Sequence, residues 1–183
     1  MFGEIRQPES SYLLIPRVSS ERRKYIPIGF FDKSTIAGDT TMIIPYATLY
    51  EFGILTSAMH MAWVRFVCGR LEMRYRYSAT IVYNNYPWPS PTEKQKQRIE
   101  ISAQDVLNAR KKYPDVSLAT LYNSNTMIPE LVKAHQKLDK AVEAAYGKKF
   151  TTDTVRVTHL FNLYQIRTAD LFSKNISPNK SRK

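Results

Sequence analysis

The sequence is poor in the residues that catalysis and covalent cross-linking require. Cys68 is the only cysteine, which excludes an internal disulfide and indicates a reducing compartment. The six glycines are scattered along the chain and form no glycine-rich phosphate or cofactor loop. The three histidines, His60, His135 and His159, fall on predicted helices without a partner at metal-ligand spacing. We therefore expect this chain, taken alone, to catalyse no reaction.

Long hydrophobic runs are also missing. The first residues lack the apolar segment of a secretory signal, and no stretch approaches the length of a membrane span. These absences predict a soluble cytoplasmic protein without a membrane partner. The 183 residues suffice for one large domain or two small ones with a hydrophobic core.

Acidic residues are in the minority, with 16 Asp and Glu against 27 Lys and Arg, and the net charge is +11. Such an excess suits a polyanionic partner, because Lys and Arg displace the counterions that are condensed on phosphates. It is equally compatible with a solvated surface, so charge alone does not identify nucleic acid as the partner.

The first half of the sequence has the pattern of short strands. Turn residues separate β-type runs over residues 11–20, 24–31, 40–46, 72–78 and 80–86. One helix is predicted within this half, over residues 55–68, with Thr56 or Ser57 as its cap and Gly69 at its end. Its predicted buried face comprises Leu55, Met59, Ala62, Trp63 and Phe66.

The second half has the pattern of helices. Three alternating prolines within residues 86–92 predict a stiff hinge. Helices are predicted over 92–113, 128–147 and 152–172, a short helix or turn over 117–123, and a disordered basic tail over 177–183. The predicted fold class is α+β, with a mostly antiparallel β-sheet domain and a packed helix over residues 1–90. A small α-helical domain follows over residues 91–183.

The stretch GRLEMRYRYS, residues 69–78, combines charged and aromatic residues in alternation. In an extended strand Glu72, Arg74 and Arg76 would lie in a row on one face. One interpretation is a solvated strand face with an ion pair of little worth. The other is a row that reads bases, because Arg donates two hydrogen bonds to guanine and Glu accepts from the cytosine amino group. A Glu-x-Arg pair could then hold both partners of one G·C pair.

The order FGILTSAMHMAWVRFVCGRLEMRYRYSATIVYNNYPWP and then LATLYNSNTMIPELVKAHQKLDKAVEAAYG resembles the C-terminal region of MmeI-like (type II) restriction–modification enzymes. These are large single chains that join a nuclease, an S-adenosylmethionine-dependent adenine methyltransferase and a target-recognition region. The resemblance covers about residues 10–170 and nearly the whole chain.

The resemblance implies a DNA target-recognition domain over residues 1–90, incomplete at its N-terminus, and a helical C-terminal domain over 91–183. It implies that Glu72 and Arg74 read one base pair and that Arg76 contributes at another. The catalytic parts would lie upstream in a parent DNA methyltransferase fused to an endonuclease. S-adenosylmethionine and Mg²⁺ would belong to that parent and not to this fragment. The implied partners are double-stranded DNA and the upstream methyltransferase domain of the same parent chain.

Further candidate DNA contacts come from basic and hydroxyl side chains near the predicted strands. A solvated loop explains the charge run at 22–24 equally well. Two other functions also fit the sequence: a helical interaction scaffold, and a non-specific single-stranded nucleic-acid binder in which tyrosines stack on bases. The further candidate contacts are Arg22, Arg23, Lys24, Thr40, Thr41 and Arg70.

Overall fold

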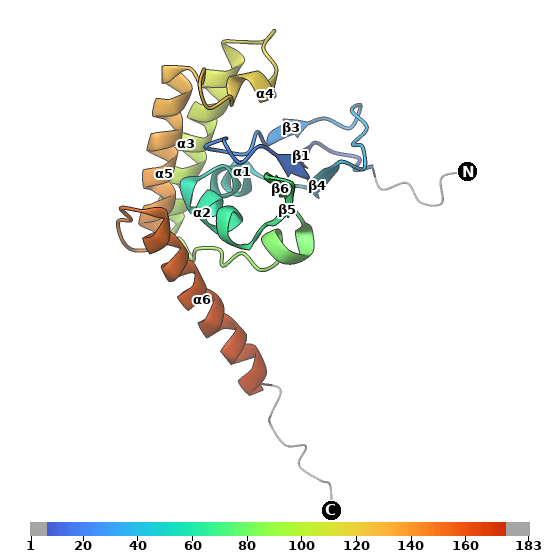
Figure 1. Cartoon of the computed structure of the whole chain (residues 1–183). Coiled ribbons are helices and arrows are strands. Elements are labelled where there is room, and N and C mark those ends of the chain that lie inside the picture. The colour runs from blue at the N-terminus through green and yellow to red at the C-terminus, as the bar shows by residue number, and fades with distance from the viewer. Residues whose placement is uncertain (1–6, 175–183) are drawn as a thin grey trace, which may run out of the picture.

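The computed structural model describes residues 7–174 and combines short strands with helices, which confirms the predicted α+β class (Figure 1). The strands are β1 (Tyr12–Pro16), β2 (Val18–Ser19), β3 (Gly29–Phe31), β4 (Thr41–Pro45), β5 (Gly69–Leu71) and β6 (Arg74–Arg76). The helices are α1 (Leu49–Leu55), α2 (Ala58–Val67), α3 (Glu93–Lys111), α4 (Leu118–Leu121), α5 (Pro129–Ala145) and α6 (Asp153–Lys174). The predicted tail over 177–183 lies outside the described residues.

The strands form two small antiparallel sheets. In the first sheet β1 lies between β3 and β4, and it buries Leu13 and Ile15 in the core. In the second sheet β6 lies between β2 and β5. Arg17 joins the two sheets, because it links β1 to β2 and its carbonyl oxygen accepts a 2.7 Å hydrogen bond from the amide of Tyr77. The chain thus passes directly from the centre of one sheet to the edge of the other.

Two helices replace the single helix predicted over residues 55–68. The Thr48 hydroxyl caps α1, and the Glu51 carboxylate accepts from the Thr48 amide in return. The chain then breaks at Thr56 and Ser57, whose hydroxyls donate to carbonyl oxygens of the preceding turn at 2.7 Å. Such local bonds compete with helix continuation. The predicted cap at Ser57 is confirmed, but it begins a second helix, α2.

Three details of the predicted elements are wrong. The strand predicted over 80–86 is a π-helical turn, Ala79–Tyr83, which the Ser78 hydroxyl caps. The strand predicted over 24–31 is reduced to β3, because the segment before it buries single side chains in the core without pairing in a sheet. Phe66, predicted on the buried face of α2, is 68% exposed. For the segment before β3, burial of side chains in the core overrides local β-propensity.

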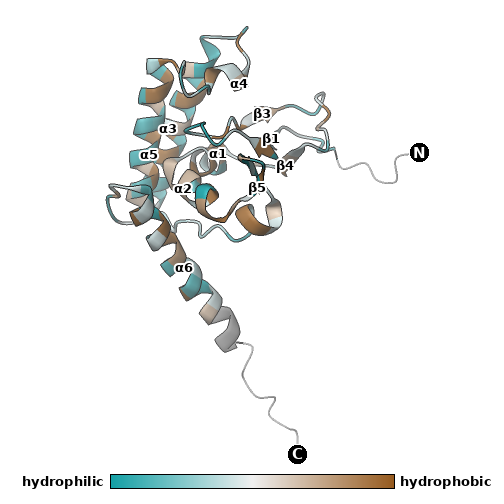
Figure 2. Ribbon diagram, in the orientation of Figure 1, coloured by the Kyte–Doolittle hydropathy of each residue, from teal (hydrophilic) through white to brown (hydrophobic). Residues whose placement is uncertain are grey.

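The helices of the second half share one core with the first half. Helices α3 and α5 pack side by side, and α1 lies against α3. Each of α3 and α5 carries both hydrophobic and hydrophilic residues, as amphipathic packing requires (Figure 2). A Cβ atom on Gly53 of α1 would lie 2.7 Å from Ile99 Cγ2 of α3, so the glycine permits this close approach. The core is therefore continuous across the two halves.

The proline-rich segment 86–92 is packed against this core and does not form an exposed hinge. Tyr86, Pro87 and Pro89 are buried. The hydroxyl of Tyr146, which follows α5, donates to the Tyr86 hydroxyl at 2.8 Å and lies 3.0 Å from the Pro87 carbonyl oxygen. Within residues 7–174, no helix is long and apolar enough to cross a membrane.

Two histidines are fully buried, and each contacts a tyrosine hydroxyl. His60 Nε2 lies 2.9 Å from the Tyr77 hydroxyl, and His135 Nε2 lies 2.6 Å from that of Tyr122. Burial lowers the pKa of His60 to about 3 and lowers the pKa of His135 well below its ordinary value. The cause is that a charged imidazolium is disfavoured away from water.

We expect the free energy of unfolding to decrease as the pH is lowered from about 7 to about 5. Histidines in the unfolded chain bind a proton near pH 6.5, whereas the buried ones stay neutral. The contribution of these histidines to the free energy of unfolding is therefore fully present above about pH 6.5. At lower pH it decreases by about 1.4 kcal/mol per pH unit for each buried histidine. Urea titrations at several pH values measure this slope. His60→Gln should make it shallower, whereas an unchanged slope would contradict a neutral buried His60.

Candidate nucleic-acid interface

The stretch 69–78 forms a β-hairpin and not the single strand that its sequence predicts. Strands β5 and β6 pair antiparallel with Leu71 opposite Arg74, and Glu72 and Met73 form the turn between them. Glu72 has a φ of 56°, in the left-handed region that costs a residue with a Cβ about 1–2 kcal/mol. The turn removes Glu72 from the strand, so the predicted row of three charged residues on one strand face is wrong. Backbone strain of this kind clusters at binding sites.

Strand β6 exposes its two arginines and buries the tyrosine between them. Tyr75 is 3% exposed, whereas Arg74 and Arg76 are exposed, which confirms the predicted alternation within β6. The alternation fails at the tip, where Met73 is 72% exposed and Leu71 is 42% exposed. The tip has no covering layer on either face, so all of residues 69–74 are exposed.

Glu72 and Arg74 lie side by side at the tip of the hairpin. Arg74 Nη2 donates to Glu72 Oε2 at 2.8 Å, and the side chains of Glu72 and Arg74 are 77% and 47% exposed. An ion pair this exposed contributes only about 0–1 kcal/mol to stability, so a ligand can take over its hydrogen bonds at little cost. The pair places an acceptor and a donor next to each other, the combination that the two bases of a G·C pair require.

Arg70, a candidate DNA contact from the sequence, holds the hairpin together. Its guanidinium lies 4.2 Å from the centre of the Tyr75 ring and donates to the carbonyl oxygens of Met73 (3.3 Å) and Arg65 (3.2 Å). These bonds join the turn of the hairpin to the end of α2. The geometry favours a structural role for Arg70.

Thr40 and Thr41 lie close to the second sheet through Arg17, a residue that sequence reasoning missed. The Arg17 amide donates to the Thr40 carbonyl oxygen at 2.9 Å, and Arg17 Nε donates to that of Thr41 at 3.1 Å. The next residue, Val18, is paired with Arg76. Arg17 and Thr40 are exposed. Local sequence patterns do not indicate this proximity, because it results from the pairing of β1 with β4, which are distant in sequence.

The three basic residues at 22–24 have different surroundings. The Arg22 side chain is 82% exposed and lies 3.5 Å from the Glu21 carboxylate. Arg23 is partly engaged within the protein, because its guanidinium donates to the Ser19 hydroxyl (3.5 Å) and the Ala119 carbonyl oxygen (3.4 Å). Lys24 is exposed. Arg22 therefore has the side chain best placed to meet a phosphate.

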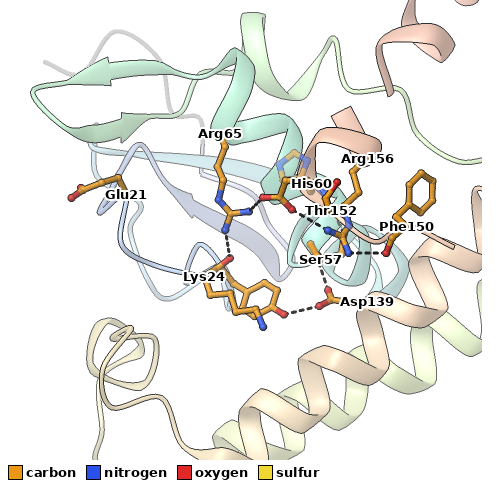
Figure 3. Close-up of polar contacts among 12 residues, drawn as sticks. Glu21, Lys24, Ser57, His60, Arg65, Asp139, Phe150, Thr152 and Arg156 are labelled. Carbon is orange, nitrogen blue, oxygen red and sulfur yellow. Dashed lines mark hydrogen bonds and ion pairs between the residues drawn. The ribbon is translucent and has the colours of Figure 1, made fainter. Parts of the chain in front are cut away.

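A network of ion pairs fixes the end of this basic segment (Figure 3). Arg65 of α2 donates to the Lys24 carbonyl oxygen at 3.1 Å and to Asp153 of α6 at 2.6 Å. Arg156 of α6 donates to Asp153 at 3.0 Å and to Glu143 of α5 at 2.6 Å. The network thus connects α5 and α6 to the basic segment 22–24.

Asp139 of α5 makes a second connection between the halves (Figure 3). Its carboxylate accepts from the Tyr25 hydroxyl at 2.6 Å and from the Ala58 amide at 2.7 Å, so it caps the first turn of α2. Burial raises the pKa of Asp139, because the charged form loses water. Helix α2 leads directly to the hairpin, and its position therefore depends on α5.

The candidate surface combines the exposed charged side chains of Glu72, Arg74 and Arg76 with the exposed Leu71 and Met73. Tyr75, between the two arginines, is buried in the core. Within residues 7–174, no group of three or more His, Cys, Asp or Glu side chains could hold a metal ion. The charged side chains of the hairpin can offer hydrogen bonds and charge to a ligand.

Comparison with known proteins identifies the family. The family model described as "MmeI, target recognition domain" matches residues 1–90, and the one described as "MmeI, C-terminal domain" matches residues 91–172. The chain belongs to the MmeI family.

Two similar proteins are much longer than this chain. DNA methyltransferase A of Bacillus subtilis (strain 168) is 42% identical over 168 residues, which cover 91% of this chain and 19% of that protein. The type IIL restriction–modification enzyme MmeI, solved in complex with DNA, is 53% identical with a TM-score of 0.87. That match covers 90% of this chain and 22% of the MmeI chain. The chain thus spans about one fifth of the length of these relatives.

Proposed function

We propose that this chain is the sequence-specific double-stranded DNA recognition module of a restriction–modification DNA methyltransferase. The observation that carries the proposal is the exposed Glu72–Arg74 pair at the tip of a hairpin, with Arg76 farther along the same strand. The family of the chain and the DNA complex of MmeI support it.

In this proposal Arg74 donates to guanine and Glu72 accepts from the amino group of the paired cytosine. Arg76 contributes at another base pair. Its partner in the sheet, Val18, follows Arg17, whose amide donates to the Thr40 carbonyl oxygen. Arg22 contacts a phosphate, which positions the module without specifying a sequence.

The catalytic work belongs to the part of the parent enzyme that lies outside this chain. The residues described here do not fit S-adenosylmethionine or Mg²⁺, because the glycines form no cofactor loop and no carboxylates are grouped to hold a metal. We assign both to the parent, an adenine methyltransferase fused to an endonuclease that acts in the cytoplasm. Within this chain, residues 1–90 carry the recognition surface, and the helices between residues 91 and 174 form the helical support.

Single-stranded binding through stacked tyrosines has less support. It requires exposed aromatic faces near the basic residues, but Tyr75 and Tyr77 are 3% and 2% exposed. The Arg70 guanidinium lies over the Tyr75 ring, and the Tyr77 hydroxyl lies 2.9 Å from His60 Nε2. A duplex read by charged side chains agrees better with this surface.

We expect the purified chain to enrich one sequence from a pool of random duplexes and to prefer it over random duplex at moderate salt. Arg22→Ala should weaken binding to both duplexes by the same factor and reduce the salt slope by about one, as loss of one phosphate contact does. Lys94→Ala removes the same charge from an exposed position on α3 and should change neither quantity. A pool without enrichment, or an altered base preference in Arg22→Ala, would contradict the proposal.

A further inference from the structure

Helix α6 has little cover from the rest of the protein. Its main contact is with α2, and it extends away from the body of the molecule (Figure 1). Over residues 153–169, Leu160 is the only buried side chain. Hydrophobic residues nevertheless recur along the helix (Figure 2). Helices in proteins gain most of their stability from packing an apolar face against the rest of the protein. In α6 only part of the apolar face is packed in this way.

A groove runs between α2 and α6 on the open side of this contact. Its volume is about 470 Å³. Phe66 is 68% exposed in it and lies edge-on to Phe161, with 5.2 Å between the ring centres. The apolar lining comprises Ala62, Phe66, Val157 and Phe161.

The charges at the rim of the groove do not suit nucleic acid. Arg65 and Asp153 line it, and their side chains neutralise each other in a 2.6 Å ion pair. Thr154, Thr158 and Asn162 add uncharged polar groups along α6. An apolar centre with a polar rim is the anatomy of a protein–protein interface, and an exposed aromatic in a pocket is its usual anchor.

We propose that the groove between α2 and α6 is the docking surface for an amphipathic helix from the remainder of the parent methyltransferase chain. This inference rests on the proposed function. The similar proteins each carry about four fifths of their length outside the matched region, so a covering segment is available in the same polypeptide. A groove between two helices accepts a third helix, whose apolar face would cover Phe66 and Phe161.

Docking here also determines where the hairpin lies. Phe66 is three residues before β5, and Arg70 of the hairpin donates to the Arg65 carbonyl oxygen at 3.2 Å. A partner that holds α2 therefore holds the base-reading tip at a fixed distance from the methyltransferase site. Loss of docking should reduce methylation without changing which bases are read.

The test compares variants of the full-length parent enzyme by amide hydrogen exchange and by methylation of its DNA site. Phe66→Glu places a charge in the groove, and Asn162→Arg adds bulk at its rim from an exposed position that contributes little to the fold. Ile101→Glu is the control, since Ile101 is 54% exposed on α3 and lies outside the groove. We expect at least tenfold faster exchange in residues 154–165 and at least tenfold slower methylation for both groove variants. The control should match the parent.

Each outcome decides the proposal. Exchange and methylation like the control in both groove variants would overturn it. So would faster exchange that depends on enzyme concentration, because the occupant would then be a second copy of the chain. A changed methylation site in these variants would overturn the assignment of docking to this groove. Failure of the proposed function is a separate result, since it would appear as an unchanged site in Glu72 and Arg74 variants.

Discussion

The double change Glu72→Lys with Arg74→Asp is expected to invert the base preference of the parent enzyme at one position of its site. In the native pair Glu72 would accept from cytosine and Arg74 would donate to guanine. The double change moves the donor to the turn and the acceptor to the strand. One orientation of a G·C pair should then be replaced by the other. Sequencing the sites that each variant methylates measures the change.

Single substitutions separate this reading role from the structure of the hairpin. Arg74→Ala should cost about 1–3 kcal/mol of discrimination at that position, the usual worth of a bidentate base contact. Glu72→Gly removes the carboxylate but relieves the strain at φ 56°, so it should lose discrimination while the hairpin stays folded. Arg76→Ala should relax a different position, because two residues advance about 6–7 Å along a strand. If the double variant still methylates the original site, Glu72 and Arg74 form only a solvated ion pair and do not read a base pair.

Sequence patterns predict those parts of the molecule in which periodicity and capping act locally. Pro129 suits the first turn of a helix, and Leu131, Leu138 and Val142 recur at helical spacing in the sequence; α5 begins at Pro129 and buries all three. The alternation within β6 is predicted for the same reason. Helix α1 also had a local signal, since Thr48 and Glu51 stand at capping-box spacing, but its short length and its glycine obscured that signal.

The arrangement of the site depends on contacts that local patterns do not contain. The turn between β5 and β6 has the sequence Glu-Met, without the Asn-Gly or Asp-Gly pair that marks a two-residue hairpin. The sequence predicts correctly that Glu72 and Arg74 lie close together. It places both on one strand face, however, whereas Glu72 lies in the turn. The roles of Arg70 and Arg17 depend on the placement of α2 and of the first sheet, which pattern and spacing do not specify.

The continuous core leads to the second large effect, which is expected for Gly53→Val. A Cβ at this position would lie 2.7 Å from Ile99 Cγ2, and 3.3 Å from both Ala103 Cβ and Leu138 Cδ1. These neighbours belong to α3 and α5, and their branched or buried groups have little room to move. We expect the substitution to lower the free energy of unfolding by about 3 kcal/mol, the upper range for overpacking a core. The melting temperature should fall by about 6–12 °C for a protein of this size.

Two comparisons tie this loss to the contact between α1 and α3. Gly38→Val is the control, because a Cβ at Gly38 has only the Thr40 hydroxyl at 4.0 Å near it, so its stability should change little. Ile99→Ala removes the clashing methyl group, and the double variant with Gly53→Val should lose less stability than the sum of the two single changes. Because the clash joins residues of both halves, hydrogen exchange in β1 and in α5 should accelerate together. Acceleration confined to one half would show that the two halves unfold independently.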